Sequence, residues 1–315
     1  MRDLKLSIVV TYCNQKDYIK TSLDSIINQK LEFNYEILIG VDGIADVETK
    51  SILKEYSNQF SNIKVFYFKS PENLIGLSRA SRNRYNLAKV SRGQYITFLD
   101  GDDFYINENR MQKGVEFLDR HFEYIGWSHS HQIYNDSTDK FGAIIAPRFN
   151  AGDINIEYLL DSNRYLFSND CIFRNYFILD NFDYCDRDYL NDTSLVFWYL
   201  QFGNIYFEPI IMLAYRTSVN SIYSGRPWIE KRISEIIVLE EHIRLFNKRK
   251  KYFKVKIKKI IEQIIKEPEK FEKLPRNYSS HIEYRNLKIS KVLLQYVNNR
   301  TLLNRTALRI AFMLL

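Results

Sequence analysis

The chain has 315 residues, of which 45% are hydrophobic, so it can bury a sizeable core as one large domain or as one domain with an appendage. Its three cysteines, Cys13, Cys171 and Cys185, lack metal-ligand spacing, which argues against a disulfide framework and a structural zinc site. The first residues lack a signal-peptide core, and no run reaches the roughly 20 apolar residues of a membrane span. We therefore expect a cytoplasmic protein without a membrane-spanning segment.

The net charge of +7 is distributed unevenly along the chain. Residues 226–315 contain 22 Lys and Arg against 9 Asp and Glu, and the remainder contains 23 against 29. This asymmetry predicts a catalytic or binding domain over residues 1–225, followed by a basic region over residues 226–315 that faces something anionic.

Strand-like and helix-like patterns alternate in the first hundred residues. Short β-branched apolar runs predict strands at residues 6–10, 35–41, 63–68 and 95–99, with helices between them. Asp46 is the expected N-cap of the second helix. Strands separated by helices imply a parallel sheet with helical crossovers, which is an α/β architecture of the nucleotide-binding kind.

The middle of the chain is less regular, and its end is almost entirely helical. Beyond residue 105 the patterns predict a helix, two strands, a helix and a strand, in the order 111–122, 124–134, 171–173, 190–200 and 205–215. Pro209 in the last of these favours an edge strand or a bend. From Trp228 onward only helical patterns follow.

Three polar clusters follow predicted strands, namely Thr11 to Asn14, Asp42 with Gly43, and Asp100 to Asp103. Ligands of open parallel sheets bind beyond the carboxyl ends of the strands, so we expect the clusters to form one site. Neighbouring carboxylates suit a hard cation such as Mg²⁺ or Mn²⁺, which commonly also holds a phosphate-bearing substrate. No glycine-rich phosphate motif follows the first strand, so a bound nucleotide would need its diphosphate neutralised by metal.

Four segments resemble the family 2 glycosyltransferases, whose nucleotide-sugar-binding α/β domain is often called the GT-A fold. They read SIVVTYCNQKDYIKTSLDSIINQ, YEILIGVDG, RNRYNLAKVSRGQYITFLDGDD and NDTSLVFWYLQFGNIYFEPIIMLAYR. The resemblance spans roughly residues 5–225. It implies a GT-A type domain with a mostly parallel central sheet, to which residues 226–315 add a mostly helical basic extension.

The resemblance also implies roles for single residues, carried over by position. Asp102 is the expected metal ligand for Mn²⁺ or Mg²⁺, and Asp192 is the expected general base. Residues expected to bind the donor and its nucleotide are Thr11, Tyr12, Asn14, Asp42, Arg82, Asp100 and Gly101. Asp103 and Arg216 are expected to support the site.

The implied reaction transfers a sugar from a nucleotide diphosphate, expected to be a UDP-sugar, to a hydroxyl of a saccharide or lipid-linked saccharide. The resemblance implies inversion at the anomeric carbon and a role in bacterial surface polysaccharide or capsule synthesis. One alternative is a sugar nucleotidyltransferase, which usually carries a glycine-rich loop after its first strand. Another is a catalytically degenerate binding or scaffold subunit, motivated by departures from the family pattern at Cys13, Val41 and Ser218.

Structural alternatives accompany these assignments. Asp192 could cap a helix, Arg82 could be a surface residue, and Cys13 could be a buried small hydrophobe. The stretch SHSH puts His129 and His131 on one strand face by period two, which suits a transition-metal pair, an acceptor contact or ordinary structural histidines.

Residues 248–265 have the pattern of an amphipathic basic helix, with apolar positions on one face and lysines beside or opposite them. Such a helix can pack on the protein with a solvated Lys face, or it can bind the anionic inner face of the cell membrane. The apolar tail RTALRIAFMLL favours membrane or oligomer contact. Nucleic-acid binding is not expected.

Overall fold

The computed structural model describes residues 4–43, 45–69, 74–145, 150–162, 165–179, 191–217, 226–270, 274 and 276–299. The chain divides into two compact units, the first made of residues 1–70 and 79–218 and the second of residues 71–78 and 219–315. The sequence predicts a boundary after residue 225, and this boundary stays a prediction. The second compact unit begins at residue 219 and also includes residues 71–78.

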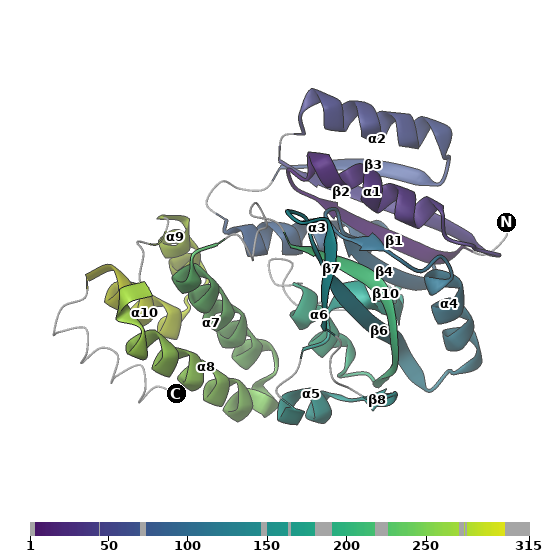
Figure 1. The fold of residues 1–315 in the computed structure, drawn as a ribbon. Helices are drawn as coiled ribbons and strands as arrows, with labels where there is room; N and C mark the ends of the chain where they lie inside the picture. The colour runs from purple at the N-terminus through teal and green to yellow at the C-terminus, as the bar shows by residue number, and fades with distance from the viewer. Residues whose placement is uncertain are drawn as a thin grey trace. The chain divides into compact units, whose positions relative to one another are not determined.

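Among the described residues of the first unit, ten strands form one sheet, and most of these strands are labelled in Figure 1. They are β1 (Leu4–Tyr12), β2 (Asn34–Asp42), β3 (Ile63–Phe68), β4 (Tyr95–Asp100), β5 (Phe104–Tyr105), β6 (Tyr124–Asn135), β7 (Lys140–Ile145), β8 (Gly152–Ile154), β9 (Cys171–Arg174) and β10 (Asn204–Thr217). The helices between them are α1 (Lys16–Ile27), α2 (Val47–Gln59), α3 (Gly76–Val90), α4 (Arg110–Arg120), α5 (Ile156–Ser162) and α6 (Asp192–Tyr199), with the short 3-10 turns η1 (Ser168–Asp170) and η2 (Tyr176–Ile178).

The sheet is mixed, and its order is β3-β2-β1-β4-β9-β6-β10-β5, with β7 paired to β6 and β8 to β10. Strands β3, β2, β1 and β4 are parallel neighbours, and β6 is parallel to β10. Strand β9 runs antiparallel between β4 and β6 and so joins the two parallel parts. The expected α/β class with a mostly parallel central sheet is confirmed.

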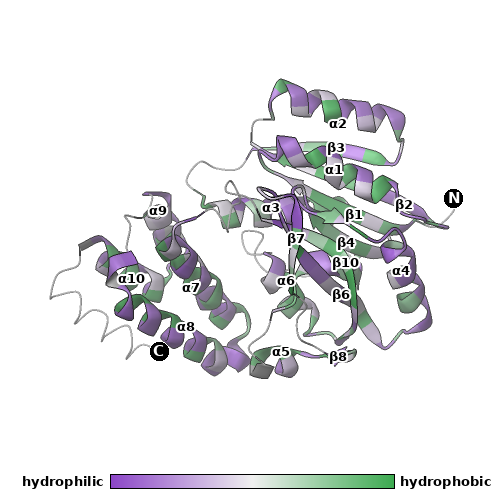
Figure 2. Ribbon diagram, in the orientation of Figure 1, coloured by the Kyte–Doolittle hydropathy of each residue, from purple (hydrophilic) through white to green (hydrophobic). Residues whose placement is uncertain are grey.

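The core lies on both faces of the parallel strands. Val9 and Val10 point to opposite faces of the sheet, and both side chains are fully buried. Helix α1 covers one face with Ile19, Leu23 and Ile26, which recur at helical spacing. Figure 2 shows the hydrophobic colour along the central strands and hydrophilic colour over much of α2. Burial on both faces explains why these strands read as continuous apolar runs.

Two expectations about individual elements need correction. The helix expected to extend to Phe122 ends at Arg120, and Phe122 is 77% exposed. Of the two alternatives predicted for Pro209, an edge strand or a bend, the edge strand is wrong, because β10 lies inside the sheet. Pro209 is accommodated there because the register between β10 and β6 shifts between Phe207 and Ile211, where no regular ladder N–H is required.

The described part of the second unit contains α7 (Trp228–Leu245), α8 (Lys250–Lys266), α9 (Arg276–Tyr284) and α10 (Lys288–Asn299). Helix α8 is the predicted amphipathic helix, and the apolar residues that form its buried face are fully inaccessible: Phe253, Ile257, Ile261 and Ile264. Its apolar face therefore packs inside the unit and leaves a lysine-rich face exposed. The tail RTALRIAFMLL falls outside the described residues. Within the described ranges, no helix combines the length and the apolar character that a membrane crossing requires.

Candidate active site

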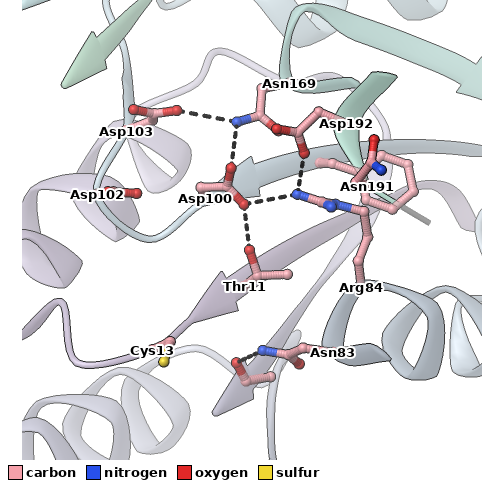
Figure 3. A network of polar contacts seen from close by, with 12 residues as sticks. Thr11, Cys13, Asn83, Arg84, Asp100, Asp102, Asp103, Asn169, Asn191 and Asp192 are labelled. Atoms are coloured by element: carbon pink, nitrogen blue, oxygen red, sulfur yellow. Dashed lines mark hydrogen bonds and ion pairs between the residues drawn. The ribbon is translucent and has the colours of Figure 1, made fainter. Parts of the chain in front are cut away.

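The ends of β1 and β4 meet as the sequence predicts. Thr11 and Asp100 are partners in the parallel register of these strands, and the Thr11 hydroxyl donates to Asp100 Oδ1 at 2.5 Å (Figure 3). The backbone N–H of Gly101 then donates to the carbonyl of Thr11 at 2.8 Å. A Cβ at Gly101 would lie 3.0 Å from that carbonyl oxygen, so glycine permits this close approach of the two strand ends.

Helix α3 brings Arg84 to the same point, where its side chain is 2% exposed. Arg84 Nη2 lies 3.0 Å from Asp100 Oδ1 and 2.6 Å from Asp192 Oδ1. In Figure 3 the guanidinium stands between the two carboxylates. Asp100 and Asp192 are far apart in the sequence, so this arginine joins the strand-end cluster to the predicted general base.

Asp192 is the first residue of α6 and not its cap. The cap is Asn191, whose side-chain oxygen accepts from the backbone N–H groups of Thr193 and Ser194. The interpretation of Asp192 as a helix cap is therefore wrong. Its side chain is 37% exposed, and its carboxylate contacts Arg84 instead. Burial raises the pKa of Asp192 to about 6, with Arg84 lowering it and Asp100 raising it.

Asn169 supplies a second bridge between acids. It belongs to η1, and its Nδ2 donates to Asp100 Oδ2 and to Asp103 Oδ2, both at 3.1 Å. The side chain is buried, and its Oδ1 has no hydrogen-bond partner among the described residues. Each hydrogen of the amide thus serves one carboxylate, which fixes the spacing of Asp100 and Asp103.

Arg216 holds the acidic loop from the β10 side. Its backbone N–H donates to Asp103 Oδ1 at 2.9 Å, and its Nε donates to the Asp102 carbonyl at 2.8 Å. Its Nη1 lies 2.6 Å from Asp136. The guanidinium also faces the aromatic rings of Tyr18, Phe104 and Tyr134. Arg216 and the buried Asp103 thus have the contacts of supporting residues, as the resemblance implies for both.

Asp102 is the acid of this loop with the fewest side-chain contacts. Its Oδ1 accepts from Gln15 Nε2 at 3.2 Å. Burial and repulsion by Asp100 raise the pKa of Asp102 to about 7, and similar causes raise the pKa of Asp103 well above its ordinary value. No group of three or more His, Cys, Asp or Glu side chains within the described ranges is arranged to hold a metal ion. The local excess of negative charge nevertheless fits a hard divalent cation beside Asp102.

Asp42 is the last residue of β2, the strand next to β1. It is 2% exposed, and its Oδ2 accepts from Arg79 Nε at 2.9 Å. Its Oδ1 is buried and has no hydrogen-bond partner among the described residues. An unsatisfied buried carboxylate oxygen is costly, so this atom lacks a hydrogen-bond donor of the kind that a ligand N–H or O–H group could supply.

The three residues that follow Thr11 differ in how far their side chains are exposed. Tyr12 needs correction, because its side chain is 1% exposed and its hydroxyl contacts Thr49 at 2.9 Å in the core. The period of two along β1 turns it away from the face of Thr11. Cys13 is half-buried and not fully buried, and burial raises its pKa, so it is not an activated nucleophile. Asn14 is exposed with φ of 59°.

Arg82 is half-buried on α3, and its predicted role near the diphosphate stays a prediction.

Three residues of the site with cationic or amide side chains were not predicted from the sequence, namely Arg79, Arg84 and Asn169. Arg79 and Asn83 are four residues apart on α3, and both reach β2, because Asn83 Nδ2 donates to the Gly40 carbonyl at 2.7 Å. The spacing of four residues places Arg79 and Asn83 on one face of the helix, so the sequence could have indicated that both face the same strand. No local signal marks Asn169, which lies in an irregular segment.

The two strand histidines have separate partners, which corrects the metal-pair alternative. His129 Nε2 accepts from Arg110 Nε at 2.6 Å, and its Nδ1 lies 2.9 Å from the Ser130 carbonyl. His131 Nδ1 lies 2.8 Å from Asp170 Oδ2. Burial lowers the pKa of His129 well below its ordinary value. His129 is therefore a neutral structural residue, whereas His131 belongs to a buried ion pair.

Comparison with known proteins matches part of the chain to a family of enzymes. Residues 7–159 match the family model described as Glycosyl transferase family 2. Over these residues the chain is similar to the family 2 glycosyltransferases, and its fold is of the GT-A type.

Particular relatives can be named. A crystal structure of Staphylococcus aureus TarS residues 1–349 in complex with UDP-GlcNAc has a TM-score of 0.61 at 14% identity, covering 98% of this chain and 89% of that one. The uncharacterized protein Rv1520 of Mycobacterium tuberculosis is 27% identical over 69% of this chain and 60% of its own length. A poly(ribitol-phosphate) beta-glucosyltransferase of Bacillus spizizenii is 31% identical over 32% of this chain and 15% of its own length. The chain thus spans about three-fifths of the mycobacterial relative.

Proposed function

We propose that this chain is an inverting glycosyltransferase that moves a sugar from a UDP-sugar to a hydroxyl of a saccharide or lipid-linked saccharide during bacterial surface polysaccharide assembly. The observation that carries the proposal is the contact of one buried guanidinium, Arg84, with both Asp100 and Asp192. The UDP-GlcNAc complex of TarS and the name of the Bacillus relative support the donor and the polymer class.

The donor would bind across the ends of β1, β2 and β4. Asp42 Oδ1 offers a buried acceptor for an N–H of the nucleobase, and Arg79 holds the other oxygen of that carboxylate. Thr11 and Asp100, linked to one another, would contact the ribose and the sugar. Buried polar atoms that are satisfied only by a ligand make recognition selective.

Asp102 would hold Mn²⁺ or Mg²⁺ in this proposal, and the ion would neutralise the diphosphate as it departs. The carboxylate is suited to this because it has one side-chain partner, Gln15, and because removing its proton next to Asp100 is costly without a cation. Asp103, whose two oxygens are taken by Asn169 and the Arg216 N–H, is left to support the loop.

Asp192 would act as the general base. It takes the proton of the acceptor hydroxyl while the acceptor oxygen attacks the anomeric carbon from the side opposite the diphosphate. The new carbon–oxygen bond forms as the bond to the diphosphate oxygen breaks, and the diphosphate leaves with the electron pair, so the configuration inverts. With a pKa of about 6, Asp192 is mostly ionised at pH 7 and can accept this proton.

A screen of nucleotide sugars for donor hydrolysis and transfer, with and without Mn²⁺, tests the proposal. We expect turnover with a UDP-sugar in the wild type. Asp192→Asn should bind UDP with unchanged affinity and lose transfer by about 10²- to 10⁴-fold, the usual contribution of general base catalysis. Equal transfer by wild type and Asp192→Asn would exclude Asp192 as the base, and no turnover with any nucleotide sugar would reject the function.

We also propose that the second unit contacts an anionic surface, such as the inner face of the cell membrane, through the exposed lysines of α8. The buried apolar face of α8 makes electrostatic contact the favoured mode over insertion of that face. Lys251, Lys258, Lys259 and Lys266 are exposed on this helix. Such binding should weaken as salt is added, because exposed charges are screened beyond about 8 Å at physiological ionic strength.

A further inference from the structure

We infer that Arg84 is the positioning residue of the general base, since one nitrogen of its guanidinium fixes the carboxylate of Asp192 relative to that of Asp100. The inference rests on the proposed function, because it takes Asp192 as the base. Nη2 carries two hydrogens, so it can donate to Asp100 at 3.0 Å and to Asp192 at 2.6 Å at the same time.

Asp100 is the rigid partner in this arrangement. Its carboxylate accepts from Thr11 Oγ1, from Arg84 Nη2 and from Asn169 Nδ2, which come from three separate elements (Figure 3). Asp192 differs, because among the described residues Arg84 is the side chain that contacts its carboxylate. Arg84 therefore fixes the position of the Asp192 carboxylate relative to Asp100 at the end of β4.

The burial of Arg84 makes this role specific. The side chain is 2% exposed, so its charge is excluded from water, and the two carboxylates that it contacts help to compensate that charge. Asp100 and Asp192 would repel one another without a cation between them. A surface arginine would lose little by changing rotamer, but moving the buried Arg84 side chain away from these carboxylates would reduce the compensation of a buried charge.

The groups that face Asp192 define what removal of Arg84 would do. They are Arg84 from α3, Asp100 and Asp102 from the end of β4, Asp170 from η1, and Tyr215 from β10. Arg84 is the cation of this set, and every carboxylate in it disfavours ionisation of Asp192. Without Arg84, the base should be harder to ionise and less precisely placed.

The test compares Arg84→Gln, Arg84→Lys and the control Arg120→Gln in the full chain. Arg120 is 74% exposed and pairs with Glu116 at 3.5 Å on the helix surface. For each variant, UDP affinity is measured by calorimetry and transfer is measured against pH. We expect Arg84→Gln to lose transfer rate by on the order of 10²-fold, the cost of about 1 Å of misplacement. The acid limb of its pH profile should move to higher pH.

Arg84→Lys keeps the charge without the planar two-donor geometry. We expect its acid limb to stay near that of the wild type while its transfer rate is still reduced, and Arg120→Gln should match the wild type. Wild-type rate and an unmoved acid limb in a folded Arg84→Gln variant would overturn the inference. If Arg84→Gln does not fold, Arg84→Lys decides, and a wild-type rate in that variant would overturn it. Failure of the wild type to use any nucleotide sugar would instead reject the proposed function.

Discussion

Removal of the Asn169 amide should destabilise the first unit measurably. Asn169→Ala deletes two hydrogen bonds to carboxylates, one to Asp100 and one to Asp103, both at 3.1 Å. Asp100 keeps its contacts with Thr11 and Arg84. Asp103 is 1% exposed, and its Oδ2 would be left without a described partner.

The expected magnitude follows from these contacts. A hydrogen bond to a charged group contributes about 1.5–3 kcal/mol. The bond to Asp100 is partly compensated, so we expect a total loss of roughly 2–4 kcal/mol in the free energy of unfolding. For a domain of about 150–250 residues, a range that includes the first unit, each kcal/mol lowers Tm by about 2–4 °C, which gives a decrease of roughly 4–16 °C.

Thermal unfolding followed by tryptophan fluorescence measures this effect. Trp127 and Trp198 are buried in the first unit and account for two of the three tryptophans. Asn58→Ala on the exposed surface of α2 is the matched control, because it removes an amide without a described contact. If Asn169→Ala melts within 1–2 °C of Asn58→Ala, the bridge does not stabilise the acidic cluster and the reasoning from its contacts fails.

Three further predictions concern other parts of the chain. Asp102→Ala should abolish Mn²⁺-dependent UDP binding in calorimetry. Burial alone would lower the pKa of His131, but Asp170 outweighs it and raises the pKa above 6.5. The stabilisation by the His131–Asp170 pair is therefore fully present below pH 6.5, and it is lost as the pH rises through the raised pKa of His131. His131→Gln should consequently lower the free energy of unfolding most at acidic pH. Lys258→Glu combined with Lys259→Glu should reduce sedimentation with anionic liposomes.

Each of these has a clear contrary result. UDP binding with unchanged Mn²⁺ dependence in Asp102→Ala would remove that residue from the metal site. The free energy of unfolding of wild type and of His131→Gln would differ by the same amount at pH 5.5 and at pH 8.5 if the His131–Asp170 contact carried no net charge interaction. Equal liposome recovery for wild type and the lysine variant, at low and at high salt, would reject the anionic-surface proposal.

The elements of the first half were predictable because each depends on local pattern. Apolar β-branched runs marked four strands within a few residues of their observed bounds. Asp46 was expected to cap α2, and its side chain does accept from the Thr49 N–H at 2.7 Å. The direction of β9 and the interior place of β10 were not predictable, because strand direction and neighbours depend on pairing across the sheet.

The sequence by itself determined that Thr11, Asp42 and Asp100 to Asp103 would gather at one edge, because the carboxyl ends of adjacent parallel strands lie together. Tertiary structure decided which cations and amides hold those acids. Arg84 and Asn169 reach Asp100 from a helix and from an irregular turn far along the chain. Their contacts depend on the packing of distant segments, which residue spacing does not encode.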